Sequence, residues 1–220
     1  MSEQQRIFIF GASGHAKVVL DIDERQRSGV VVEVFDDNPE KAGQMLLGYR
    51  VAGGRNELLK RGAKAGLVIV AIGGNPARRS VAKWLGSQGF AFASAVHPAA
   101  QVAREVRIAT GSVVMAGTAI NPDTDIGMHC IVNTGASVDH DCTLGDGVHV
   151  APGARLCGGV SVGEGAFIGA GAVVVPGRRI GGDAIIAAGA VVLKDVPERA
   201  VVAGNPAKPL NEHEPDRNSH

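Results

Sequence analysis

The sequence predicts an α/β domain with a small, Rossmann-like parallel sheet, followed by an all-β left-handed parallel β-helix of hexapeptide repeats. Three observations support this fold. Every sixth residue from Val96 to Val192 is Val, Ile or Leu, which is the period of a hexapeptide β-helix. Glycine accounts for 31 of 220 residues, whereas the aromatic residues are six Phe, one Tyr and one Trp. Before Val96, short apolar runs alternate with segments of helical periodicity.

The N-terminal part, residues 1–95, is predicted to form the Rossmann-like domain. Its strand-like apolar runs lie at 7–10, 30–35 and 67–72. The segments 16–23 and 75–88 have helical spacing, and Pro76 suits the first turn of a helix. Strands that alternate with helices form parallel βαβ units, so we expect a small doubly wound sheet.

Ligands of such a sheet bind at the carboxyl ends of its strands. The loops expected there are 11–15, 36–37 and 73–75. Glycines allow the backbone to approach a phosphate, and the helix that follows 11–15 would supply N–H donors. The loop has GxxG rather than GxGxxG spacing, so NAD chemistry is not indicated. Together the loops favour a nucleotide-type ligand, although 11–15 could also be a plain strand-to-helix turn, and Asp36 a solvated turn residue.

The β-helix is predicted to span residues 96–193. Each hexad supplies one strand and one turn, so about eighteen residues form one triangular coil, with the stride aliphatics stacked inside. A solenoid needs both ends covered. We expect the N-terminal domain to cover one end, and 194–210 to cover the other or to cross onto a neighbouring subunit. The remainder of the C-terminal segment 194–220 is read as a polar tail over 211–220.

One turn, at 133–142, concentrates polar side chains. His140 lies two residues after the inward-facing Val138, and Asp139 and Asp141 flank it. A carboxylate beside an imidazole fixes its tautomer and raises its basicity, as a general base requires. The sequence leaves open which Asp pairs with His140, and a polar surface turn without a catalytic role is the alternative.

Composition narrows the functional classes. Lys+Arg and Asp+Glu both number 22, which removes the electrostatic argument for binding nucleic acid or an anionic membrane. High glycine without a Gly-X-Y period or excess proline argues against collagen and disorder. No apolar run predicts a membrane span or a signal peptide, and three Cys form no disulfide framework, so we expect a cytoplasmic protein.

The hexad array, the segment Ile9–Val19, Asn133-Thr134 and Asp139-His140-Asp141 together resemble bacterial sugar acetyltransferases. The resemblance is to the family that N-acetylates nucleotide-linked 4-amino-sugars, such as the bacillosamine and perosamine N-acetyltransferases, and covers nearly the whole chain. Sialic acid O-acetyltransferase-like proteins share the same layout. The resemblance implies an acyltransferase with acetyl-CoA as donor, no metal, and a UDP- or GDP-linked amino-sugar as acceptor.

The resemblance also implies roles for individual residues. His140 would be the general base, assisted by Asp141. The nucleotide-sugar would contact Gly11, Ser13, Gly14, His15, Asp36, Gly73, Asn75 and Asn133. Acetyl-CoA would contact His149, Gly158, Ala170, Ala188 and Lys208. The amino group would attack the thioester directly, without an acyl-enzyme, and the active sites of a homotrimer would lie at subunit interfaces.

Three other interpretations remain from the sequence. The same histidine base could serve a sugar O-acetyltransferase, and the fold could be a non-catalytic nucleotide-binding scaffold. A zinc enzyme of this coil type needs three histidines around one metal. The intervals between His129, His140 and His149 do not bring them to one corner of eighteen-residue coils. Arg78, Arg79 and Lys83 are expected on a solvated helix face, from which Arg78 could reach a phosphate.

Overall fold

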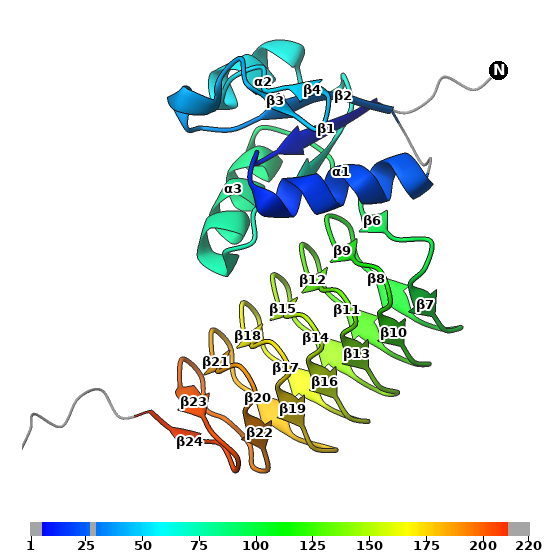
Figure 1. Cartoon of the computed structure of the whole chain (residues 1–220), viewed down its shortest axis with the longest axis vertical. Coiled ribbons are helices and arrows are strands. Elements are labelled where there is room, and N and C mark those ends of the chain that lie inside the picture. Colours follow the sequence, from blue (N-terminus) through cyan, green and yellow to red (C-terminus); the bar gives the residue numbers. More distant parts are fainter. Residues whose placement is uncertain (1–5, 27–29, 211–220) are drawn as a thin grey trace, which may run out of the picture.

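The computed structural model describes residues 6–26 and 30–210, so the tail predicted at 211–220 lies outside the described residues. The chain forms a small α/β domain and a β-helix, which confirms the predicted fold class (Figure 1). The strands of the α/β domain are β1 (Arg6–Phe10), β2 (Val30–Phe35), β3 (Met45–Leu46), β4 (Tyr49–Arg50) and β5 (Leu67–Val70). Its helices are α1 (Gly14–Gln26), the short 3-10 helix η1 (Pro39–Lys41), α2 (Arg55–Arg61) and α3 (Asn75–Ser87).

The sheet of the α/β domain has the strand order β2-β1-β5, and all three strands are parallel. Alternate side chains of a strand point to opposite faces of the sheet, and both sets of side chains on the central strand β1 are buried. Ile7 and Ile9 pack in one apolar cluster with residues of α1. Phe8 and Phe10 pack in another with residues of α2 and α3. The helices therefore cover both faces of the sheet.

The β-helix is built from three parallel sheets, which we number in the order in which the chain enters them. Sheet 1 contains β6 (Ala95–Val96), β9 (Val113–Val114), β12 (Ile131–Val132), β15 (His149–Val150), β18 (Phe167–Ile168), β21 (Ile185–Ile186), β23 (Val201–Ala203) and the antiparallel β24 (Lys208–Pro209). Sheet 2 contains β7 (Gln101–Val102), β10 (Ala119–Ile120), β13 (Ser137–Val138), β16 (Arg155–Leu156), β19 (Val173–Val174) and β22 (Val191–Val192). Sheet 3 contains β8 (Arg107–Ile108), β11 (Asp125–Ile126), β14 (Thr143–Leu144), β17 (Ser161–Val162) and β20 (Arg179–Ile180).

Each coil pairs with the next at a spacing of eighteen residues, as the stride predicts. Val132 lies opposite Val150, which in turn lies opposite Ile168. The stride aliphatics from Val114 to Val192 form one buried cluster inside the prism. The residue before each stride position points outward and gives each sheet its surface chemistry.

The two ends of the prism differ. At the C-terminal end, Val196 and Val202 are buried against the core, and β23 extends sheet 1. Residues 194–210 therefore lie against this end, which is the first of the two alternatives that the sequence leaves open. The first coil is less covered, and its stride residue Val102 is 39% exposed.

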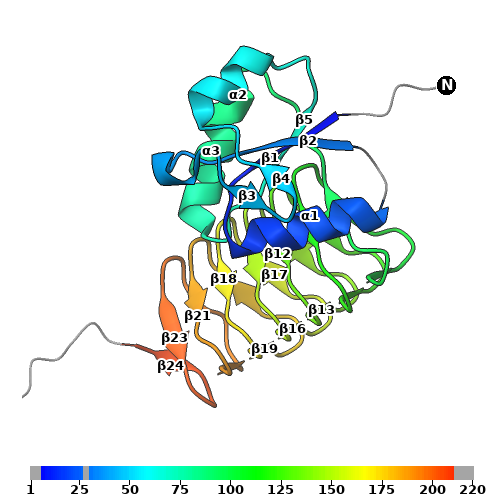
Figure 2. The same ribbon diagram turned by 45° about the horizontal axis from the view of Figure 1, so that its top comes forward.

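The N-terminal domain packs along the side of the β-helix, which corrects the prediction that it covers an end (Figures 1 and 2). The outward residues Ala95, Val113 and Ile131 of sheet 1 are buried in one cluster with Val19 and Leu20 of α1. The reason is that sheet 1 presents an apolar outer surface along its first strands, where α1 can bury its own apolar face. This arrangement places the carboxyl ends of the α/β strands beside the middle coils. In the described part of the chain, no helix has the length and apolarity needed to cross a bilayer.

Candidate active site

His140 lies at the corner between sheets 2 and 3, in the turn that follows β13. Its Nδ1 is 2.6 Å from Oδ2 of Asp141, and its backbone N–H donates to Oδ1 of Asp139 at 2.9 Å. Asn121 holds that same Oδ1 of Asp139 at 2.7 Å. The ring therefore pairs with Asp141, which answers the question that the sequence leaves open. With Nδ1–H donating to a carboxylate, Nε2 is the nitrogen that can accept a proton.

The surroundings of His140 increase its basicity. The hydrogen bond that the ring donates to Asp141 and the nearby charge of Asp139 raise the pKa of the imidazole. The side chains of His140 and Asp141 are 61% and 66% exposed, so solvent and ligands can reach them. This half of the predicted site has the composition of a general base and its orienting carboxylate.

Gly158 lies beneath the His140 ring, one coil further along. A Cβ at Gly158 would sit 2.6 Å from both Cε1 and Nε2 of His140. The N–H of the next residue, Gly159, donates to the His140 carbonyl at 2.9 Å. Because Gly158 has no side chain, the imidazole ring of His140 can pack directly against the backbone there.

His149 lies on the outer surface of sheet 1 and contacts Asn133. The Oδ1 of Asn133 accepts from the Thr134 N–H at 2.8 Å, so its Nδ2 is the atom that lies 3.1 Å from Nε2 of His149. Nε2 then accepts a hydrogen bond and the proton of the neutral ring sits on Nδ1. The His149 ring also packs edge-on against the ring of Phe167, with the two ring centroids 5.2 Å apart. Burial and the charge of Arg78 lower the pKa of His149 to about 4, so it is neutral near pH 7.

His15 brings the α/β domain to the same region. It is the second residue of α1, and burial followed by the charges of Arg78 and His149 lowers its pKa to about 4. Nε2 of His15 is buried and has no hydrogen-bond partner among residues 6–26 and 30–210, and Nδ1 of His149 is buried with the Gly73 backbone as its polar neighbour in those residues and no well-formed hydrogen bond. A neutral imidazole nitrogen without a partner is costly to bury, so this pair of rings is a natural contact point for a polar ligand.

The glycine loop at 11–14 is held tightly at its start and open at its end. Gly11 has φ +117°, and a Cβ there would lie 2.6 Å from the Ala71 carbonyl, so only glycine fits. A Cβ at Gly14 or at Gly73 would meet nothing within 4 Å. The open glycines therefore leave the carboxyl edge of the sheet accessible, and Ser13 beside them is exposed.

Asp36 organises this edge of the sheet. Its carboxylate accepts hydrogen bonds from the Ala12 N–H at 2.7 Å, Lys41 at 2.8 Å and the Asn38 N–H at 2.9 Å. Burial opposes ionisation, but these three donors outweigh it and lower the pKa of Asp36. A cavity of about 350 Å³ lies beside it, lined in part by Phe10, Gly11, Asp36 and Ile72. A second cavity of about 530 Å³ adjoins the same carboxylate.

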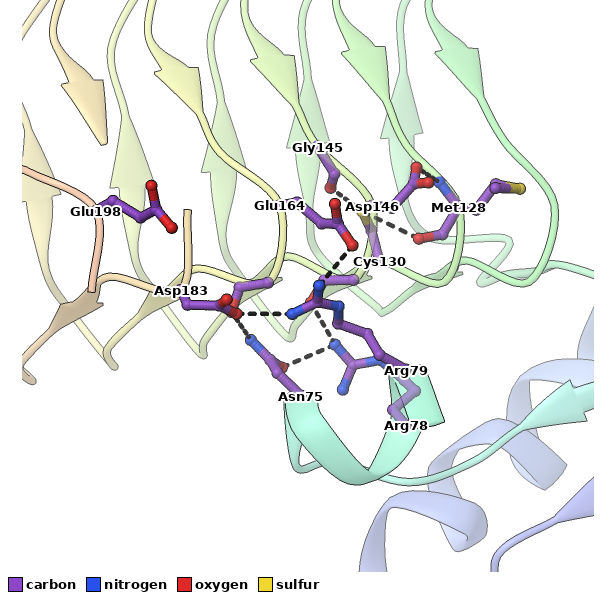
Figure 3. Close-up of polar contacts among 12 residues, drawn as sticks. Asn75, Arg78, Arg79, Met128, Cys130, Gly145, Asp146, Glu164, Asp183 and Glu198 are labelled. Atoms are coloured by element: carbon purple, nitrogen blue, oxygen red, sulfur yellow. Dashed lines mark hydrogen bonds and ion pairs between the residues drawn. The ribbon is translucent and has the colours of Figure 1, made fainter. Parts of the chain in front are cut away.

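Asn75 joins the two domains in this structure (Figure 3). Its Nδ2 donates to the carbonyls of Gly165 at 2.8 Å and Ala166 at 3.1 Å, and its Oδ1 accepts from Arg78. The Asn75 side chain therefore makes contacts within the domain interface, whereas the resemblance implies that it contacts the nucleotide-sugar. Arg78 is also buried at the interface, which corrects its predicted place on a solvated face and its reach toward a phosphate. Helical spacing alone does not signal either role.

The predicted acetyl-CoA residues fall on two corners of the prism. Gly158 shares the corner between sheets 2 and 3 with His140. Ala170 and Ala188 continue a stack with Thr134 and Pro152 at the corner between sheets 1 and 2, as the successive turn hydrogen bonds show. Lys208 is exposed in β24, near the C-terminal end of sheet 1. Within one chain, sheet 2 therefore lies between His140 and the group formed by Asn133 and His149.

The histidines considered for a zinc site are also apart. His129 lies at the corner between sheets 3 and 1, His140 at the corner between sheets 2 and 3, and His149 on sheet 1. In the described residues, no three His, Cys, Asp or Glu side chains gather closely enough to hold a metal ion. A small α/β domain beside a hexapeptide β-helix that carries an exposed His–Asp pair is the architecture of the hexapeptide-repeat acyltransferases.

Comparison with known proteins supports this class. Residues 6–85 match the PglD N-terminal domain family, and residues 159–194 match the bacterial transferase hexapeptide family. No curated protein sequence matches the chain. Among solved structures, perosamine N-acetyltransferase from Caulobacter crescentus, a histidine-to-asparagine variant in complex with CoA and GDP-perosamine, is 41% identical. Its TM-score is 0.89, and the alignment covers 94% of this chain and 97% of that one.

Two further structures give the same picture. The acetyltransferase domain of PglB from Neisseria gonorrhoeae, in complex with acetyl coenzyme A, is 35% identical over 94% of this chain and 100% of that chain, with a TM-score of 0.87. WeeI from Acinetobacter baumannii AYE is 31% identical over 93% of this chain and 99% of that chain, with a TM-score of 0.85. The chain belongs to the family of these hexapeptide-repeat sugar N-acetyltransferases. It is an acyltransferase, and the first two of these relatives were solved with CoA and acetyl coenzyme A bound.

Proposed function

We propose that this enzyme transfers an acetyl group from acetyl-CoA to the 4-amino group of a nucleotide-linked amino-sugar. The observation that carries the proposal is the exposed His140–Asp141 pair, held over Gly158, in a chain 41% identical to perosamine N-acetyltransferase. That relative was crystallised with CoA and GDP-perosamine, which supports a nucleoside-diphosphate-linked amino-sugar as the acceptor.

In the proposed mechanism, the amine attacks the thioester carbonyl directly. Nε2 of His140 removes the proton as the new C–N bond forms, and Asp141 stabilises the imidazolium. A backbone N–H stabilises the oxyanion, and the CoA thiolate leaves as the tetrahedral intermediate collapses. Cys142 is buried and burial raises its pKa, which disfavours the thiolate that a covalent acyl-enzyme would need.

We further propose that the site is completed between the subunits of a homotrimer. His140 lies at the edge of sheet 2 that adjoins sheet 3, whereas the Asn133–His149 group lies at the edge that adjoins sheet 1. The two groups can therefore meet only between chains, where the His140 edge of one subunit faces the Asn133 edge of its neighbour. A three-fold axis facing sheet 2 produces that arrangement. Three of the outward residues of sheet 2, Ala119, Val173 and Val191, are half-buried and apolar, whereas Gln101, Ser137 and Arg155 are polar, so this face has the mixed character of an interface with an apolar part. In sheet 3 every outward residue is polar, namely Arg107, Asp125, Thr143, Ser161 and Arg179.

The same geometry suggests where the two substrates bind. The nucleotide would lie at the open glycines of the α/β sheet, beside Asp36, with its sugar extending toward His15, Asn133 and His149. Acetyl-CoA would run between a corner bearing His140 and Gly158 and a neighbour's corner bearing Ala170 and Ala188. The N–H of Gly158 has no partner among the residues that the structure describes, and it is free to donate to the thioester or pantetheine arm. Lys208 would meet the CoA phosphates as a point charge.

Thiol release from acetyl-CoA in the presence of candidate acceptors tests this function. We expect rapid release of CoA with a GDP- or UDP-linked 4-amino-sugar, and none with the corresponding 4-hydroxy sugar. Amide formation should be verified by mass spectrometry of the product. Turnover of the hydroxyl acceptor instead of the amine would favour an O-acetyltransferase. Nucleotide-sugar binding without any acetyl transfer would favour a non-catalytic scaffold.

A further inference from the structure

Arg78 is a deeply buried arginine at the junction of the two domains, with a relative exposure of 1% (Figure 3). Its guanidinium donates five hydrogen bonds, and every acceptor belongs to a neutral group. The acceptors are the carbonyls of His129 at 2.8 Å, Ile72 at 3.1 Å, Gly73 at 2.9 Å and Gly147 at 2.8 Å, and Oδ1 of Asn75 at 2.8 Å. The planar fork thus uses all its donors at once.

The neighbouring arginine shows a different arrangement. Arg79 forms ion pairs with Glu164 at 2.5 Å and Asp183 at 2.6 Å, also across the domain junction but at its exposed rim. Arg78 has no carboxylate among its hydrogen-bond acceptors, although burying a charge without a counter-ion is unfavourable. No carboxylate neutralises the positive charge of Arg78 within its hydrogen-bond network, so this charge influences the nearby titratable groups His15 and His149.

The acceptors of Arg78 belong to the two halves of the proposed site. Ile72 and Gly73 lie in the loop after β5, at the carboxyl edge of the α/β sheet. Gly147 lies two residues before His149 in the β-helix. We propose that Arg78 is a positioning residue for acetyl transfer: it fixes the loop after β5 against the coil that carries His149, so that an acceptor held by one domain is aligned with a donor held by the other. The proposal rests on the function proposed above.

The charge of Arg78 adds a second effect on the same region. Arg78 is the charged group that faces His149 from α3, and Arg78 and His149 both face His15 at the start of α1. After burial, the charge of Arg78 is the next cause that lowers the pKa of each ring to about 4. Both imidazoles thus stay neutral, and His149 keeps the tautomer that Asn133 selects.

Two substitutions separate geometry from charge. Arg78→Lys keeps the charge, but an ammonium on a single stem cannot bridge both domains as the fork does. We expect kcat to fall about 10²-fold, because misplacing reacting groups by about 1 Å has that cost, with a smaller change in KM. Arg78→Gln removes the charge, so an NMR titration of the histidine side chains should show the pKa values of His15 and His149 rising toward the ordinary value. In Arg78→Lys they should stay low.

Arg79→Lys is the matched control, because it alters the adjacent arginine of the same interface, whose partners are carboxylates at the rim. It should retain kcat within about threefold. The proposal is overturned if Arg78→Lys is as active as Arg79→Lys, or if the pKa of His149 does not rise in Arg78→Gln. Acetyl transfer by the wild-type enzyme to none of the acceptors would reject the proposed function instead. The titration requires no substrate and still decides whether Arg78 controls His149.

Discussion

Replacing His140 by Ala is expected to lower kcat by about 10²–10⁴-fold, the range that a positioned general base contributes. The affinity for the nucleotide-sugar should not change, because His140 lies at the corner between sheets 2 and 3, away from the glycine loop. The free energy of unfolding should also stay close to wild type, since the His140 side chain is 61% exposed. Steady-state thiol release, calorimetric binding and thermal melting measure the three quantities.

The control for this variant is His97→Ala. His97 is another histidine of the β-helix, and its Nδ1 accepts only a local hydrogen bond, from the Ala99 N–H at 2.9 Å. Its replacement should leave kcat unchanged. Near-normal turnover by the His140→Ala variant would remove the general base from the mechanism.

Replacing Gly158 by Ala is expected to lower kcat by about 10–10²-fold without unfolding the protein, because small misalignments of a catalytic group have large effects. The new Cβ would lie 2.6 Å from Cε1 and Nε2 of His140, so the exposed ring would have to rotate away. The backbone tolerates a side chain here, because Gly158 lacks a positive φ and Pro176 occupies the equivalent corner one coil later. Kinetics and a melting curve of the variant check both parts.

A double variant shows whether Gly158 acts through His140. In a His140→Ala background, Gly158→Ala should cause no further loss of kcat, because effects on one functional unit are not additive. Pro176→Ala, which changes the same corner two coils away from His140, should be active. An independent, multiplicative loss in the double variant would contradict a role in placing the imidazole.

The sequence predicts the β-helix well because its period is local and repeated. Each stride residue meets its equivalent eighteen positions later, so one rule fixes the coil, the core and the register. The His140 turn is visible for the same reason, since its polar residues interrupt a regular pattern. Which aspartate pairs with the His140 ring can be seen only in the structure, because Asp139 and Asp141 are both adjacent to His140 in the sequence.

The placement of the N-terminal domain is not predicted by that rule. Docking depends on contacts between residues far apart in sequence, such as Asn75 with Gly165 and Arg78 with Gly147. A signal was available in the outward residues: those of sheet 1 begin with Ala95, Val113 and Ile131, whereas those of sheet 3 begin with Arg107 and Asp125. The apolar set marks the face that another domain covers. Nothing in the helical pattern around Arg78 distinguishes a buried guanidinium from a solvated one.

Mixed trimers test most directly whether the active site is completed between neighbouring chains. Subunits with His140→Ala and subunits with His149→Ala, each nearly inactive alone, would be co-expressed with different tags and purified as mixed assemblies. An interface between an intact His140 and an intact His149 then arises in about one quarter of the sites of a random mixture. If the two histidines meet across the interface, the mixed assemblies should transfer acetyl groups at close to that fraction of the wild-type rate. Mixed assemblies no more active than either parent would show that the two histidines do not meet across an interface.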